Sequence, residues 1–275
     1  MPELPEVETI RQKLRSGSGA VPSMVGQRIE GVSLRWPRHI KQPSVTTFRK
    51  RIRGRLVQGV DRRGKFLLIP LDEQTLAIHL MMSGDLRMAD SDTPRGKFDH
   101  TIFKFESGWQ LRFSDSRKFG RVFLMKDSDD LVGRLGPEPL ADSFDPKSLA
   151  QILSAHRRAL KPLLLDQSMI AGLGNIYTDE ALHRAKLHPL RRSDSLDSEE
   201  VGALWKGIRG ALQSGLHHNG ASIDWVYRGG EFQNYFRAYG RGGEPCPRCG
   251  TEIVRTVVGQ RGTYFCPSCQ VEELN

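Results

Sequence analysis

The cysteines constrain the fold most, because all four lie in two Cys-x-x-Cys pairs near the end of the chain. Sixteen residues separate the inner cysteines of the two pairs. This spacing is typical of a zinc site with four thiolate ligands, in which the ion closes a small hairpin. The expected ligands are Cys246, Cys249, Cys266 and Cys269. Four thiolates leave no open coordination position, so we expect one structural zinc ion; redox use of the pairs is the weaker alternative.

The rest of the chain is long and basic. Its 275 residues favour two domains, and 41 Lys and Arg against 32 Asp and Glu give a net charge of +9. This excess favours a polyanionic partner such as nucleic acid or an anionic membrane surface, although a generally basic surface is an alternative. No stretch approaches the roughly 18 apolar residues of a membrane span, and the N-terminus lacks the apolar core of a signal peptide. We expect a cytoplasmic protein with no membrane partner.

The first half of the chain combines one helix with short strands. Apolar positions at helical spacing predict a helix over Glu6–Arg15. Between about residues 26 and 126, short apolar runs broken by glycine predict a largely antiparallel sandwich or barrel. The expected strands are Arg55–Val60, Lys65–Pro70, Thr75–His79, Thr101–Glu106, Trp109–Phe113 and Arg121–Met125.

The second half is predicted to be mainly helical. A proline-rich segment, residues 133–145, is expected to be a linker. The helices expected after it are Pro146–Ser154, Leu160–Asp166, Asn175–Ala185 and Ser198–Leu216. Residues 220–243 are rich in glycine, tyrosine and arginine and are expected to form a long loop, and loops of that length are usually functional or disordered.

Pro2 raises the possibility of covalent chemistry. Initiator methionine is commonly removed before a small residue, and a free secondary amine could then attack an electrophilic carbon. With Met1 attached, the same nitrogen is an inert amide. Proline is also favoured where helices begin, so the residue alone leaves both interpretations open.

Seven motifs along the chain together resemble bacterial formamidopyrimidine-DNA glycosylases. They are PELPEVE (2–8), RGKF (63–66), HLMMSG (79–84), RKFG (117–120), LGPEP (135–139), GNIY (174–177) and the cysteine hairpin. The resemblance runs over essentially the whole chain. It implies an α+β protein with an N-terminal antiparallel β-sandwich, a helical helix-two-turn-helix domain and a C-terminal zinc finger. The expected boundaries are 1–132 for the sandwich with its first helix, 133–145 for the linker, 146–240 for the helical domain and 241–275 for the finger.

The resemblance also implies a set of catalytic residues. Pro2 matches the nucleophile that attacks the anomeric carbon of the sugar, and Glu3 matches the acid that assists ring opening and proton transfer. Lys65 matches a lysine that assists catalysis. Arg261 matches the finger arginine that grips the flanking phosphates and is linked to the second elimination step. Glu6 either orients the site or interacts with the helix dipole.

DNA contacts are implied for a further group of residues. Met82, Arg117 and Phe119 match the side chains that fill the space left by an extruded nucleotide. Further DNA contacts, mainly to phosphates, are expected from His79, His156, Arg157, Lys161, Asn175 and Tyr239. For His79, a core histidine with satisfied hydrogen bonds is the alternative.

Several residues depart from the family pattern. Met81 replaces a usual glycine, and Ser116 and Lys118 replace a usual proline and a second arginine. Phe98 stands where many relatives have histidine, which leaves open whether Phe98 or His100 contacts DNA. Residues 220–236 diverge most, in the segment that closes over the flipped base, so the sequence does not fix lesion preference.

The resemblance implies a bifunctional glycosylase and abasic-site lyase that excises formamidopyrimidines and 8-oxoguanine. Its substrate is double-stranded DNA with oxidised bases or abasic sites, and we expect a monomer associated with the bacterial nucleoid. An endonuclease VIII-like enzyme for oxidised pyrimidines is one alternative. A non-enzymatic zinc-finger DNA-binding protein is the other.

Overall fold

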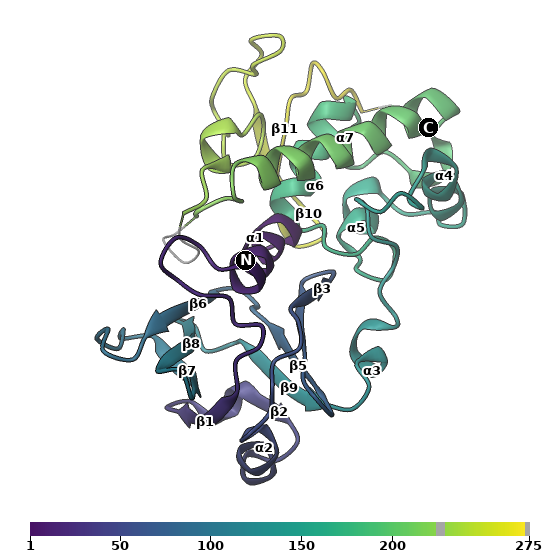
Figure 1. The fold of residues 1–275 in the computed structure, drawn as a ribbon. Coiled ribbons are helices and arrows are strands. Elements are labelled where there is room, and N and C mark those ends of the chain that lie inside the picture. The colour runs from purple at the N-terminus through teal and green to yellow at the C-terminus, as the bar shows by residue number, and fades with distance from the viewer. Residues whose placement is uncertain (224–228, 273–275) are drawn as a thin grey trace. The chain divides into compact units, whose positions relative to one another are not determined.

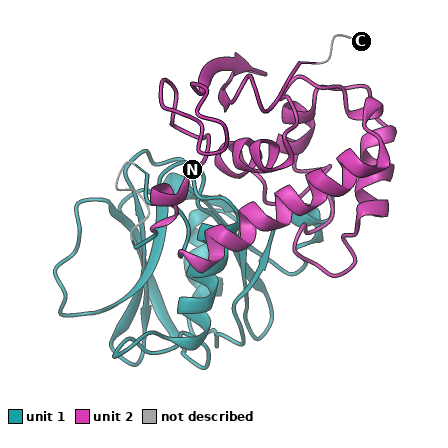
Figure 2. Cartoon of the chain, turned by 90° about the horizontal axis from the view of Figure 1, so that it is seen from above, with its two compact units in different colours: residues 1–134, 219–230 teal, residues 135–218, 231–275 magenta. Residues whose placement is uncertain are grey.

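The computed structural model describes residues 1–223 and 229–272 and consists of two compact units (Figure 2). Unit 1 comprises residues 1–134 and 219–230, and unit 2 comprises 135–218 and 231–275. The chain therefore passes from one unit to the other inside the segment expected to be a linker. It later returns to unit 1 for a short stretch within the expected helical domain.

In its described residues, unit 1 has two β-sheets and three α-helices (Figure 1). The four-stranded sheet has the order β1-β7-β8-β6, and the five-stranded sheet has the order β2-β9-β5-β4-β3. The bounds are α1 Leu4–Ser16, β1 Ile29–Leu34, β2 Ile40–Gln42, α2 Val45–Ile52, β3 Asp61–Arg63, β4 Phe66–Pro70, β5 Thr75–His79, β6 Gly84–Asp90, β7 Asp99–Phe105, β8 Trp109–Asp115, β9 Arg121–Met125 and α3 Asp129–Val132, with a 3-10 turn at Pro37–His39.

One apolar core joins these elements. Along β4, Leu67 and Ile69 are fully buried and their neighbours are partly exposed, as expected when alternate side chains point to opposite faces. Val7 of α1 and Phe103 of β7 are fully buried in the same core. The expected first helix, β5 and β9 are confirmed, and the two-sheet architecture agrees with the expected sandwich.

The sheets differ from expectation at one strand. The strand expected over Arg55–Val60 is wrong, because Leu56 and Val57 form only isolated bridges, each to a different segment. The sandwich is largely antiparallel, as expected, and the short strand β2 pairs in parallel with β9.

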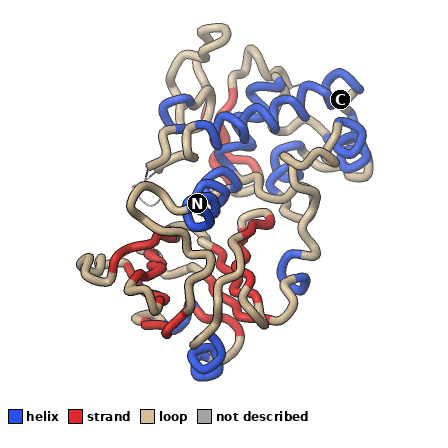
Figure 3. Tube along the Cα trace, in the orientation of Figure 1, coloured by secondary structure: helices blue, strands red, loops and turns tan. Residues whose placement is uncertain are grey.

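Unit 2 combines helices with a C-terminal hairpin (Figure 3). Its elements are α4 Pro146–Ser154, α5 Leu160–Leu165, α6 Asn175–Ala185, α7 Ser198–His217, β10 Val254–Val258 and β11 Arg261–Phe265, with 3-10 turns at Ser193–Ser195 and Phe232–Tyr235. All four expected helices are confirmed within one residue at each end. Capping explains two of the starts: the Asp145 carboxylate accepts from the Ser148 N–H, and Asp197 begins α7 with a capping box.

Glycine allows α6 and α7 to pack closely. A Cβ at Gly207 would lie 2.6 Å from the Ala181 carbonyl oxygen, and one at Gly215 would lie 2.4 Å from the Tyr177 ring.

None of the helices in the described part of the chain has both the length and the hydropathy needed to cross a bilayer.

Candidate active site and nucleic-acid interface

The start of α1 places Pro2 and two acidic side chains in a buried position. Pro2 is buried, and Glu3 and Glu6 are 2% and 1% exposed. Glu3 is the N-cap residue, and its backbone N–H donates to Glu6 Oε2 over 2.8 Å. Glu6 Oε1 accepts a second hydrogen bond of 2.7 Å from the Ala221 N–H. One carboxylate therefore ties the N-terminal segment to the segment that returns to unit 1.

Lys65 and His79 lie at the same end of two adjacent strands of the five-stranded sheet, β4 and β5. Lys65 is 6% exposed and immediately precedes β4, whereas His79 ends β5 and pairs in register with Phe66. Burial, followed by the charges of Lys65 and Arg121, lowers the pKa of His79 to about 4. The ring is therefore neutral near pH 7. The Met81 N–H donates to Nδ1 over 3.0 Å, which leaves the ring proton on Nε2 and makes that nitrogen a neutral donor.

Two loops of unit 1 carry Met82, Arg117 and Phe119, which we call the insertion group. Met82 lies between β5 and β6, and the other two lie between β8 and β9. Met82 and Phe119 are 39% and 53% exposed, which is unusual for large apolar side chains. The Arg117 Nη1 lies 3.8 Å from the Met82 sulfur, so the two loops meet at these side chains. All three side chains expected to enter the duplex are exposed.

Three residues that depart from the family pattern, Met81, Ser116 and Lys118, lie in the same two loops. Met81 has φ of +55° and Lys118 has φ of +61°, in the left-handed region that favours glycine. Met81 therefore occupies a glycine-like conformation where the family usually has glycine. Nearby, Phe98 is 41% exposed, whereas burial lowers the pKa of the partly buried His100.

In unit 2, the structure gives Lys161 surroundings that differ from the phosphate contact expected for it. Its side chain is fully buried on α5, and Nζ lies 2.6 Å from Asp179 Oδ1 and 2.9 Å from the Gly262 carbonyl oxygen. Asp179 Oδ2 accepts from the Tyr264 N–H over 3.0 Å. Burial raises the pKa of Asp179, and the Lys161 ammonium opposes that shift. Lys161 is thus a buried ion-pair partner that holds the β10–β11 hairpin.

Asn175 is the first residue of α6 and is also tied to the hairpin. Its Nδ2 donates to the same Gly262 carbonyl over 2.8 Å. Arg261 is exposed and begins β11, directly after Gly259 and Gln260, which have φ of +55° and +62°. Two positive φ angles are typical of the tight turn that joins antiparallel strands. The turn presents Arg261 to solvent next to the anchored strand.

The remaining residues expected to contact DNA have varied surroundings. Arg157 is exposed, with Nε 3.4 Å from Asp194 Oδ2, whereas His156 is partly buried and its Nδ1 lies 2.9 Å from the Ile152 carbonyl oxygen. Tyr239 is partly buried, and its backbone N–H donates to Glu180 over 3.0 Å.

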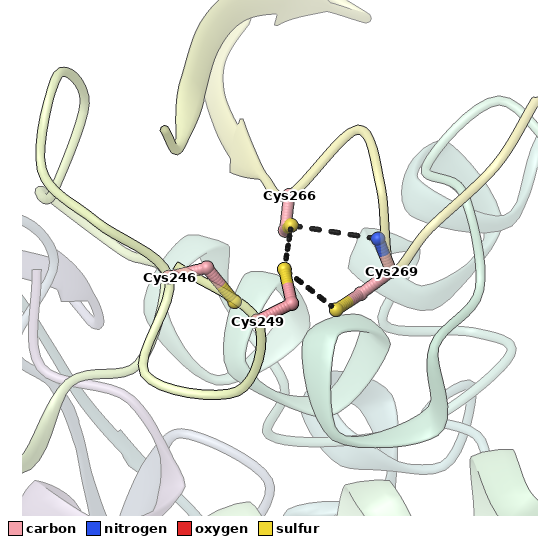
Figure 4. A group of neighbouring side chains, drawn as sticks. All are labelled: Cys246, Cys249, Cys266 and Cys269. Atoms are coloured by element: carbon pink, nitrogen blue, oxygen red, sulfur yellow. Dashed lines mark hydrogen bonds between the residues drawn. The ribbon is translucent and has the colours of Figure 1, made fainter. Parts of the chain in front are cut away.

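The four cysteines converge at the base of the hairpin (Figure 4). All four sulfurs lie within 4.8 Å of one another, and the Cys249 sulfur lies 3.4 Å from those of Cys266 and Cys269. Ligands about 2.3 Å from a tetrahedral zinc ion are separated by about 3.8 Å, so the cluster fits that ion. The Arg248 N–H donates to the Cys246 sulfur over 3.4 Å, which suits a thiolate. One structural zinc ion agrees with this geometry and donor set.

The sequence analysis missed several buried acids that organise these regions. Asp115 accepts hydrogen bonds from both loops of the insertion group, and Glu180 accepts from three consecutive N–H groups, residues 237–239. The contact of Glu6 with Ala221 was also missed. The only available signal was an acidic residue within or next to an apolar run, and such residues are usually exposed.

Comparisons with known proteins identify the family. The model described as "Formamidopyrimidine-DNA glycosylase N-terminal domain" matches residues 1–122, "Formamidopyrimidine-DNA glycosylase H2TH domain" matches 135–226, and "Zinc finger found in FPG and IleRS" matches 243–271. The formamidopyrimidine-DNA glycosylase of Roseiflexus sp. (strain RS-1) is 46% identical over 280 residues, which cover 98% of this chain and 100% of that protein. The chain belongs to the formamidopyrimidine-DNA glycosylase family.

Solved structures of this family have the same fold. A MutM protein in complex with DNA containing carbocyclic 8-oxo-G has a TM-score of 0.89 and 39% identity, covering 98% of this chain and 100% of that one. The FPG (MutM) protein of Lactococcus lactis in complex with DNA containing Fapy-dG has a TM-score of 0.89 and 38% identity with the same coverage. The resemblance inferred from the seven motifs is thereby confirmed.

Proposed function

We propose that this protein excises formamidopyrimidines and 8-oxoguanine from double-stranded DNA in base excision repair and then cleaves the abasic strand. The observation that carries the proposal is the match over 98% of the chain to family members solved on DNA with such lesions. The buried Pro2 and the insertion group, both within unit 1, support it, because the reaction needs a nucleophile and a means of holding the lesion outside the helix.

The proposed nucleophile is the secondary amine of Pro2 after removal of Met1. The nitrogen attacks C1′ of the lesion nucleotide, the glycosidic bond breaks, and the departing base takes up a proton. The nitrogen gives up its proton, the C1′–O4′ bond opens as O4′ takes up a proton, and C1′ and the nitrogen form an iminium. The iminium acidifies the C2′ proton, whose loss expels the 3′ phosphate; a second elimination expels the 5′ phosphate. Glu3 is suited to transfer protons at the sugar, because its carboxyl group belongs to the residue next to the amine.

We assign supporting roles to the other catalytic residues on charge and position. Lys65 places an ammonium group close enough to His79 to affect its pKa. Arg261 presents an exposed guanidinium that can stabilise a phosphate leaving group. Zinc, when bound by the four cysteines, holds the finger that carries Arg261 and takes no part in the chemistry.

The proposed DNA contacts follow exposure and hydrogen bonding. Met82, Arg117 and Phe119 fill the vacated space, while His79 donates a neutral N–H to phosphate. Asn175, Tyr239, His156 and Arg157 contribute further backbone contacts. Lys161 acts indirectly, by fixing the hairpin. Either Phe98 or His100 can contribute next to the insertion group, and exposure favours Phe98.

Borohydride trapping tests the chemistry. Protein lacking Met1 is expected to form a covalent complex with a duplex containing 8-oxoguanine opposite cytosine, and Pro2→Gly should weaken trapping severely. Protein that retains Met1 is the matched control, because its Pro2 nitrogen is an amide. Glu3→Gln should lower the rate of strand cleavage about 100-fold.

Two outcomes would contradict the proposal. Salt-sensitive DNA binding without trapping, in protein shown by mass spectrometry to lack Met1, would favour a non-enzymatic binding protein. Exclusive cleavage of duplexes containing thymine glycol would favour the pyrimidine-specific alternative. Because the relatives are bacterial, we further propose that the protein acts as a monomer in the bacterial cytoplasm, at the nucleoid.

A further inference from the structure

The two loops that carry the insertion group meet at one buried carboxylate. Asp115 is the last residue of β8 and its side chain is completely buried. Its position is one residue before the loop that carries Arg117 and Phe119. The loop that carries Met82 reaches the same carboxylate through Ser83.

Hydrogen bonds from both loops converge on the two oxygens of Asp115. The Ser83 hydroxyl donates to Oδ1, and the Arg117 N–H donates to the same oxygen over 3.2 Å and to the Ser83 hydroxyl oxygen over 2.9 Å. The Gly120 N–H donates to Oδ2 over 2.7 Å. The donors at residues 117 and 120 lie on either side of Phe119 in the sequence, and the donor Ser83 directly follows Met82. Each loop is therefore hydrogen-bonded to Asp115 close to the side chains of the insertion group.

A buried histidine supports the carboxylate from the core side. His39 Nε2 lies 3.3 Å from Asp115 Oδ2, and both side chains are completely buried. The other ring nitrogen lies 3.0 Å from the Thr101 hydroxyl, and the ring packs against Phe113 at 4.8 Å between centroids. The carboxylate is thus in contact with a buried side chain outside the two loops, in addition to its donors within them.

Steric contacts confine the loops to this arrangement. A Cβ at Gly120 would lie 2.3 Å from the Phe113 ring and 3.0 Å from Asp115 Oδ2. A Cβ at Gly84 would lie 2.4 Å from the Leu80 carbonyl oxygen. The positive φ angles of Met81 and Lys118 add local strain, and strained backbone persists only where its surroundings determine it.

We infer that Asp115 is a positioning residue that fixes the two loops relative to each other, so that Met82, Arg117 and Phe119 enter the duplex as one preformed group. This role rests on the proposed function. Burying an ionised carboxylate is costly unless donors surround it, and here those donors come from the two functional loops. Without the Asp115 carboxylate, both loops would have to become ordered at the same time as the nucleotide is extruded.

If Asp115 has this role, its loss should affect two reactions of the same active site differently. Excision of a base from a duplex requires the vacated space opposite the orphaned base to be filled, whereas cleavage of an abasic site in a single strand does not. Asp115→Asn preserves the shape of the side chain. The amide NH2 group would replace one of the two oxygens, and it would then face the N–H donor of either Arg117 or Gly120. We expect kcat/KM for excision of 8-oxoguanine from a duplex to fall roughly 10- to 100-fold. Cleavage of a single-stranded abasic site should stay near the wild-type rate.

Asp99→Asn is the matched control. Asp99 is also completely buried and lies on β7 of the same sheet. Its carboxylate accepts from Arg87 over 2.8 Å and from the Gly96 N–H over 2.9 Å, and these partners belong to neither loop. This variant should be less stable than wild type but retain the ratio of the two activities.

Each outcome decides the question. If Asp115→Asn keeps both activities, or loses both in proportion, the positioning role is overturned. If this variant does not fold, Ser83→Ala decides instead, since it removes only the hydroxyl link and should lower duplex excision selectively, by a smaller factor. Wild-type protein with neither activity would overturn the proposed function itself, whereas an active wild type with an unaltered activity ratio in both variants overturns only the positioning role.

Discussion

The imidazole of His79 is held in a single protonation state by its surroundings. Burial and the nearby cations lower its pKa to about 4, while the ordinary value is 6.5. Between these pH values the unfolded chain binds more protons than the folded one. Stability from this residue is therefore present above pH 6.5 and is lost as the pH falls toward 4. A shift of this size is worth on the order of 3 kcal/mol.

We predict that His79→Gln flattens the pH dependence of stability in this range, because glutamine does not titrate. Urea unfolding at pH 5 and pH 7 measures the effect, and His217→Gln, which changes an exposed histidine, is the control. Equal pH dependence in wild type and His79→Gln would show that the imidazole is not held neutral.

The sequence motifs point to the side chains expected to act on DNA. They do not point to the buried side chains that hold those residues in place. Met82, Arg117 and Phe119 could be proposed from the sequence because each belongs to a motif with a known order along the chain, and their role in DNA stays a prediction. Asp115 and Glu180 were not, since an acidic residue has the same appearance in a sequence whether it is solvated or accepts several buried hydrogen bonds. Only the fold supplies the donors that distinguish the two cases.

At the scale of elements, the connection between α5, α6 and the hairpin is the most consequential. Lys161 on α5 and Asp179 on α6 form a buried ion pair, and Lys161 also donates to β11. Removing one partner of such a pair typically costs about 3–5 kcal/mol, because the other charge stays buried without compensation. The helices and the strand next to Arg261 are therefore coupled.

We predict that Lys161→Met weakens DNA binding without changing its salt dependence. A direct phosphate contact contributes about 0.9 to the slope of log K against log salt, and an indirect anchor contributes nothing. Arg157→Ala is the comparison: this exposed side chain should account for about one such contact. Binding measured from low to high salt decides the matter, and a reduced slope for Lys161→Met would restore the phosphate contact expected from the sequence.

Elements with strong local signals were predictable, and those stabilised by distant partners were not. The helices α4 and α6 begin and end where expected, since apolar spacing and terminal residues act within one turn. The helix α2 and the strands β1 and β6 were missed. The run Arg55–Val60 has strand-like composition, but its backbone has no continuous neighbour with which to pair, and that neighbour is a property of the tertiary structure.

At the scale of the whole molecule, we expect the zinc ion to stabilise one region, the C-terminal finger with β10 and β11. The finger has its own small apolar cluster, formed by Ile253 with Cys246 and Cys266, and we expect a cluster of this size to need the ion in order to fold. We predict that a strong chelator removes hydrogen-exchange protection from β10 and β11 but leaves β4 and β5 protected. Strand cleavage should be lost at the same time, and added zinc should restore both. Protection of the hairpin that survives complete removal of zinc would contradict this assignment.

Overall composition anticipated two domains and a polyanionic partner, but not the path of the chain between units. The return of residues 219–230 to unit 1 depends on contacts such as that of Ala221 with Glu6, about 215 positions earlier in the chain. Sequence periodicity carries no information about a pairing between such distant residues.

That pairing has a consequence for how substrate range can change. The Glu6 carboxylate accepts hydrogen bonds both from Glu3, next to the proposed nucleophile Pro2, and from Ala221, where the divergent segment begins. We therefore expect that this segment can be exchanged while its attachment at Ala221 is kept. If this segment is exchanged between family members while Glu6 and Ala221 are kept, we expect the preferred damaged base to change. The proposed catalytic residues should stay in place.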